Sequence, residues 1–140
     1  GQALHRQFAD TPHKILALEL GGNNPLVVWN AKDLQAAAVI AVQSAFLSAG
    51  QRCTAARRLI VSEAQADDLV AAILKMVSRL IVDEPFAKLQ PFMGPVIDNA
   101  AADHLQEQFL GLMIKGAKVI RRLDRPQEGL PFLTPAMIDV

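Results

Sequence analysis

The order of apolar and polar positions along the 140-residue chain predicts strands that alternate with helices. The clearest helix is predicted over residues 63–81, where Leu69, Ile73 and Val77 recur at helical spacing. Further helices are expected over 2–9, 33–49 and 98–116, and strands over 14–20, 26–29, 59–61, 117–120 and 137–140. Such alternation is typical of the α/β class, here a mostly parallel sheet with helices on both faces.

Polar and small residues mark the predicted helix ends. Asp33 is a candidate N-cap for the second helix, and Asp98 or Asn99 caps the last one. Gly50 and Gly116 follow the last periodic positions, as glycine commonly does at helix C-termini. The segments 83–95 and 123–131 contain prolines and are predicted to be loops.

Composition narrows the function classes. Hydrophobic residues make up 51% of the chain and the formal net charge is zero, which favours a packed domain over disorder. No Lys/Arg run exceeds two residues, so nucleic-acid binding is not expected. The longest wholly apolar run, 36–42, falls far short of the roughly 20 residues of a membrane helix. A single cysteine forms no internal disulfide and fits a reducing compartment, so we expect a cytoplasmic protein.

That single cysteine, Cys53, is the first candidate for chemistry. It lies in the stretch Ala49 to Thr54, between a predicted helix and a predicted strand. A lone cysteine is commonly a small buried hydrophobe, but polar or positive neighbours such as Arg52 favour a reactive thiolate. The residues alone leave both interpretations open.

Glu19 is the second candidate. It interrupts an apolar run just before the turn at Gly21 and Gly22, and it lies 34 residues before Cys53. It is either an outward-facing carboxylate or a general base made effective by partial burial.

The three histidines, His5, His13 and His104, lack the spacing of metal ligands, so no metal site is predicted. No phosphate-binding loop, paired-carboxylate motif or dinucleotide-binding glycine motif is present. A cysteine–histidine hydrolase remains an alternative.

Two motifs together resemble the NAD(P)-dependent aldehyde dehydrogenase family. One is the glutamate motif Leu18-Glu19-Leu20-Gly21-Gly22. The other is the cysteine motif, Phe46 followed by Gly50-Gln51-Arg52-Cys53. Their order and separation are also those of the family. The finer pattern, including residues 20–25, 43–46 and 56–59, is similar to the family's succinylglutamate semialdehyde dehydrogenase branch, which serves arginine catabolism.

The resemblance implies a role for each candidate residue. Cys53 would be the nucleophile that forms a thioester, and Glu19 the base that activates water to hydrolyse it. Gly1, Leu20 and Gly21 would contact NAD, with NADP as the alternative, and Arg52 would bind the substrate. The resemblance implies two kinds of partner: a small-molecule aldehyde substrate, N-succinylglutamate 5-semialdehyde, and further copies of the full-length chain in a homo-oligomer.

The resemblance also implies that the chain is an internal fragment. It begins at Gly1 without methionine and stops within a strand-like run. Residues 1–20 would be the end of the cofactor-binding domain, and residues 21–140 a part of the catalytic domain. The alternative function is that of an isolated fragment without activity, which acts only as a structural or self-associating domain.

Overall fold

The computed structural model describes residues 1–140 and confirms the α/β class. The elements in chain order are α1 (Gln2–Gln7), β1 (Asn24–Val28), α2 (Leu34–Phe46), the 3₁₀ segment η1 (Leu47–Gly50), β2 (Ala56–Val61), α3 (Glu63–Val77), α4 (Asn99–Ile114), β3 (Lys118–Arg121) and β4 (Met137–Asp139). No helix has both the length and the apolar character needed to span a bilayer.

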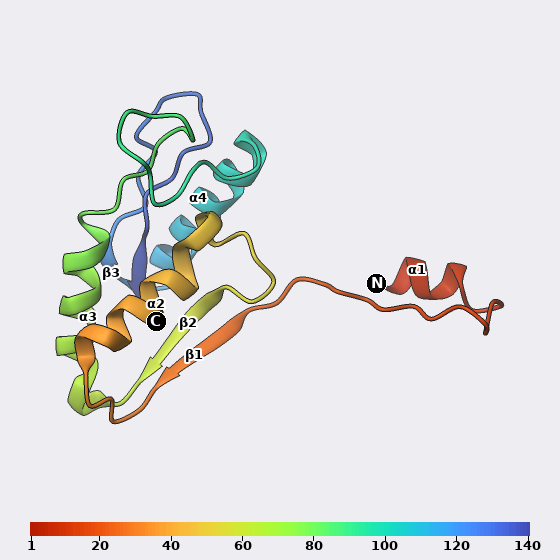
Figure 1. The fold of residues 1–140 in the computed structure, drawn as a ribbon, viewed down its shortest axis with the longest axis horizontal. Coiled ribbons are helices and arrows are strands. Elements are labelled where there is room, and N and C mark those ends of the chain that lie inside the picture. Colours follow the sequence, from red (N-terminus) through yellow and green to blue (C-terminus); the bar gives the residue numbers. More distant parts are fainter.

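The main body is built on a parallel pair of strands, β1 and β2, joined by the crossover helix α2 (Figure 1). Alternate strand residues, such as Val28, face α2 and α3 and share their core. Within that core, Leu69 and Ile73 of α3 are almost wholly buried. Val27 and Ile60 point to the opposite face and remain exposed, so the helices of this chain cover one face of the pair.

The predicted helix caps are confirmed. The Asp33 carboxylate accepts a hydrogen bond of 3.0 Å from the Ala36 backbone N–H, at the start of α2. The Asp98 carboxylate accepts a hydrogen bond of 2.7 Å from the Ala101 backbone N–H, so Asp98 rather than Asn99 caps α4. Each bond satisfies one of the donors that a helix N-terminus leaves unpaired.

Two predicted elements are wrong. Residues 14–20 form no strand. A strand also needs a neighbouring strand for its backbone hydrogen bonds, and none pairs with this segment. The helix expected to reach Ala49 ends at Phe46, because Ser48 and Ala49 take left-handed φ angles of 58° and 54°. The chain therefore turns sharply out of α2 before the cysteine.

The N-terminal segment stands apart from the body. In Figure 1, α1 and the extended residues that follow it project away from the strands and helices and rejoin them at β1. No residue of α1 is buried. The expected domain boundary at residues 20 and 21 lies in the extended connection before β1.

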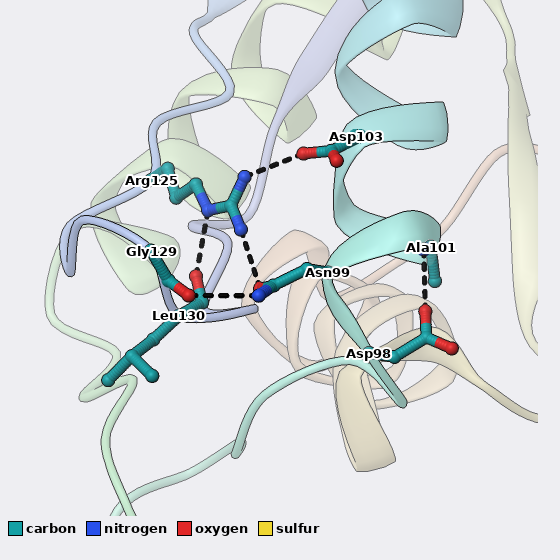
Figure 2. A network of polar contacts seen from close by, with 7 residues as sticks. All are labelled: Asp98, Asn99, Ala101, Asp103, Arg125, Gly129 and Leu130. Atoms are coloured by element: carbon teal, nitrogen blue, oxygen red, sulfur yellow. Dashed lines mark hydrogen bonds and ion pairs between the residues drawn. The ribbon is translucent and has the colours of Figure 1, made fainter.

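The C-terminal part adds an antiparallel pair, β3 and β4, rather than further parallel strands. A loop before β4 is fixed to α4 by Arg125, whose guanidinium reaches Asp103, Asn99 and the Leu130 carbonyl (Figure 2). These three contacts measure 2.7, 2.6 and 2.8 Å respectively. Beneath the loop, Leu133 is buried in a small second core with residues of α4 and the loop before it.

Candidate active site

The approach to Cys53 is an unusual left-handed turn. Ser48, Ala49 and Gly50 have consecutive φ values of 58°, 54° and 69°. Left-handed backbone costs about 1–2 kcal/mol for a residue with a Cβ, and glycine avoids that cost. A Cβ on Gly50 would also lie 2.8 Å from the Ala45 carbonyl oxygen. The turn thus needs glycine at position 50, and it sets the direction in which the chain leaves α2.

Cys53 itself lies in a β-turn closed by the Ala55 N–H, which donates to the Arg52 carbonyl at 3.1 Å. Its thiol is free and exposed, and no hydrogen bond engages the sulfur. The Cys53 backbone N–H has no partner within the chain either. A free thiol and an unused donor therefore belong to the same exposed residue.

Two side chains hold this turn in place. Asn24, the first residue of β1, donates from Nδ2 to the carbonyls of Cys53 and Ala55. Gln51 accepts a bond of 2.8 Å from the Ile97 N–H and so ties the turn to the loop before α4. Sequence reasoning missed Asn24, since only the register of β1 beside β2 brings it to the cysteine.

Arg52 is directed at the end of α2. Its Nη2 atom donates to the carbonyls of Gln43 and Ser44 at 3.1 and 3.0 Å. Both carbonyls lie in the last turn of α2, where the helix dipole favours a cation, and that of Gln43 also accepts the Leu47 N–H. Nη1 and Nε have no partner within the chain, and Nε is buried, so Arg52 combines two bonds from Nη2 with unpaired donors on its other nitrogens. Its role toward a substrate stays a prediction.

Glu19 is exposed rather than partly buried. It lies in the extended connection five residues before β1, while Cys53 lies three residues before β2. Because β1 and β2 are parallel and Asn24 is paired with Ala56, both residues approach the same, amino end of the pair. No hydrogen bond or ion pair joins Glu19 to Cys53. The structure brings their segments to one edge without joining the side chains.

Two of the three predicted cofactor contacts lie together. An open hollow is lined by Gly1, Leu18, Leu20 and three residues of α1. A Cβ on Gly1 would lie 2.9 Å from Leu20 Cδ1, so a side chain at this position would require the Leu20 side chain to shift. Gly21 does not line it, and its surroundings are open within 4 Å.

The histidines offer no partner to the thiol. His104 on α4 is paired with Gln108 at 2.9 Å, and His5 and His13 belong to the N-terminal segment. None of them is hydrogen-bonded to Cys53, so nothing in the structure favours the cysteine–histidine hydrolase. No group of three His, Cys, Asp or Glu residues is arranged to hold a metal ion.

A sequence model of the aldehyde dehydrogenase family matches residues 1–140. The chain belongs to this family. It is 60% identical over 140 residues to an N-succinylglutamate 5-semialdehyde dehydrogenase of Sphingopyxis alaskensis, a match that covers 100% of this chain. The chain spans 29% of that relative's length. Membership of the family confirms the resemblance that the glutamate and cysteine motifs indicated.

Solved structures agree. A succinate-semialdehyde dehydrogenase from Burkholderia pseudomallei superimposes with a TM-score of 0.89 at 31% identity, over 99% of this chain and 28% of that one. A betaine aldehyde dehydrogenase from Staphylococcus aureus, in complex with NAD+, gives a TM-score of 0.86 at 26% identity. It covers 99% of this chain and 28% of that one. The arrangement of the elements is thus that of aldehyde dehydrogenases.

Proposed function

We propose that Cys53 and Glu19 supply the nucleophile and the general base of an NAD(P)-dependent aldehyde dehydrogenase. The observation that carries the proposal is the state of Cys53, an exposed free thiol in a turn whose backbone is held from outside. A structural cysteine is typically buried among apolar side chains. Membership of the family supports the same chemistry.

The proposed reaction begins when the Cys53 thiolate attacks the aldehyde carbon. A carbon–sulfur bond forms, and the carbonyl oxygen takes the negative charge. The free Cys53 N–H is a donor for that oxyanion, and one donor of this kind can contribute about 10²–10³ in rate. After loss of hydride the acyl group remains on sulfur as a thioester. Glu19 then takes a proton from water, which attacks the thioester and releases the carboxylate and the free thiol.

NAD is the proposed cofactor, with NADP as the alternative, and its nicotinamide supplies the hydride acceptor. Gly1 and Leu20 fit this role as neighbouring walls of the hollow beside α1. Arg6 places a cation at the same hollow, which suits an anionic group. Gly21 is proposed as a third contact because its surroundings are open.

N-succinylglutamate 5-semialdehyde is the proposed substrate, on the strength of the relatives that carry that name. This aldehyde carries carboxylates, and the unpaired Nη1 of Arg52 is the proposed contact for one of them. The full-length protein is proposed to work in the cytoplasm as a homo-oligomer. Exposed apolar side chains on the open face of β1 and β2, such as Trp29, are consistent with burial against further protein.

The deciding experiment replaces Cys53 in the full-length protein. With N-succinylglutamate 5-semialdehyde and NAD, the parent should form NADH, and Cys53→Ser should lose this activity. A Thr54→Ser variant controls for a change elsewhere in the same turn. Formation of NADH by Cys53→Ser at the parental rate would refute the nucleophile.

Glu19→Gln tests the second step. Because the proposed base acts after hydride transfer, this variant should keep a rapid burst of NADH and lose steady-state turnover by about 10²-fold or more. Rapid mixing with absorbance at the NADH band separates the two phases. A Glu19→Gln variant with unchanged turnover would remove Glu19 from deacylation.

The alternative is that the 140 residues alone are inactive and only self-associate. The exposed Val27 and Ile60 on one face of the strand pair favour association. Titration with NAD separates the two functions, since an inert fragment would neither bind the cofactor nor turn over. Sedimentation of the same fragment would report its association.

A further inference from the structure

Asn24 connects the two segments that carry the candidate catalytic residues. It begins β1, five residues after Glu19, and its carboxamide reaches across to the turn that contains Cys53. From Nδ2 it donates to the Cys53 carbonyl and, at 3.3 Å, to the Ala55 carbonyl. No other side chain is hydrogen-bonded to Cys53.

We propose that Asn24 is the positioning residue of the cysteine turn. The inference rests on the proposed function of Cys53 and deepens it. Asn24 is not hydrogen-bonded to the sulfur, and it acts by fixing the carbonyl of the residue that carries the thiol.

The reason lies in the geometry of the turn. The bond from Ala55 to Arg52 closes the turn but leaves its central peptide, between Cys53 and Thr54, free to rotate. The two common turn types differ by a flip of that peptide, which changes ψ of the first central residue by about 150°. A donor fixed on the Cys53 carbonyl selects one orientation of this peptide, and so holds the ψ angle of Cys53.

Groups beside Asn24 leave room for its side chain and fix the backbone next to it. A Cβ on Gly22 would lie 3.1 Å from Asn24 Oδ1, so the glycine leaves the carboxamide the room that it occupies. Arg58 of β2 donates to the Asn23 carbonyl at 3.0 Å and fixes the entry to β1. The start of β1 and the Cys53 turn are therefore joined at one place, beside the first residue pair of the strands.

The test compares Asn24→Ala and Asn24→Asp with Asn23→Ala in the full-length protein. The aspartate variant keeps the size of the side chain but presents an oxygen to the Cys53 carbonyl instead of a donor. Asn23 is the matched control, because its side chain makes no hydrogen bond. In both Asn24 variants the rate of the NADH burst should fall about tenfold or more while KM changes less, since misplacement of a reacting group mainly slows the chemical step. Asn23→Ala should keep the parental burst rate.

Alkylation by iodoacetamide separates the positioning role from the proposed oxidation, because it reports on the thiol without an aldehyde. Mass spectrometry of the Cys53 peptide should show an alkylation rate changed by about fivefold or more in both Asn24 variants and unchanged in Asn23→Ala. Parental burst and alkylation rates in a folded Asn24→Asp variant would overturn the positioning role. A parent that forms no NADH would overturn the proposed function, and the alkylation rates would still decide the role of Asn24.

Discussion

Gly50 offers a sharp test of how the chain reaches the cysteine turn. Its φ of +69° lies in the left-handed region, and a Cβ there would lie 2.8 Å from the Ala45 carbonyl oxygen. That oxygen belongs to the backbone of α2 and cannot move aside as a side chain would. Gly50→Ala therefore combines two penalties, one conformational and one steric.

Two other glycines separate these penalties. Gly129 has a nearly identical φ of +72°, but a Cβ there would meet nothing within 4 Å. Gly111 lies within α4 and is also open, so alanine there meets neither penalty. The three substitutions add the same methyl group in three different settings.

The expected free energies of unfolding follow from this comparison. Gly111→Ala should raise stability by about 0.5–1 kcal/mol, because alanine is the better helix former. Gly129→Ala should lose about 1 kcal/mol, since the left-handed cost of about 1–2 kcal/mol exceeds the gain from a less flexible unfolded chain. Gly50→Ala should lose about 1–3 kcal/mol more than Gly129→Ala, as overpacking at a rigid contact typically does.

Urea unfolding of the full-length protein measures these differences, provided that the m-value is unchanged among the variants. The alkylation rate of Cys53 should change in Gly50→Ala and stay parental in Gly129→Ala, since only Gly50 precedes the cysteine turn. Equal losses of stability for Gly50→Ala and Gly129→Ala would refute the contact with the Ala45 carbonyl.

Two further predictions concern the parts that support the site. Leu69→Ala should lower the free energy of unfolding by about 3–5 kcal/mol, because Leu69 is 0% exposed in the core between α2 and α3. Leu110→Ala, on the exposed surface of α4, should lower it far less. Arg125→Lys should lose about 1–2 kcal/mol in the same urea assay, because a lysine cannot reproduce the forked contacts to Asn99 and Leu130. Asp103→Asn should cost less than about 1 kcal/mol, as the Asp103 side chain is 60% exposed and its ion pair is screened; a larger loss would contradict this assignment.

Much of the fold could be predicted because its signals are local. The spacing of Leu69, Ile73 and Val77 defined α3, and Asp33 and Asp98 marked the starts of two helices. These signals depend on residues within one or two helical turns. Periodicity and capping therefore needed no knowledge of distant contacts.

The errors arose where structure depends on distant partners or on backbone strain. Residues 14–20 alternate like a strand, but a strand also needs a neighbour, which alternation does not reveal. Ser48 and Ala49 adopt left-handed angles that their residue types disfavour, so local propensity predicted a longer helix. The contact from Asn24 to Cys53 spans 29 residues and follows only from the strand register.

The candidate site combines a fixed backbone with a free thiol. Asn24 holds the carbonyl of Cys53, Gln51 holds the start of its turn, and Gly50 sets the entry. No hydrogen bond engages the sulfur or the backbone N–H of Cys53, which are the two groups of this residue that the proposed reaction would use. Catalytic groups work best when they are held by neighbours that do not consume their own bonding capacity. Substitutions at Asn24 and Gly50 should therefore alter the reactivity of Cys53 although neither residue touches its sulfur.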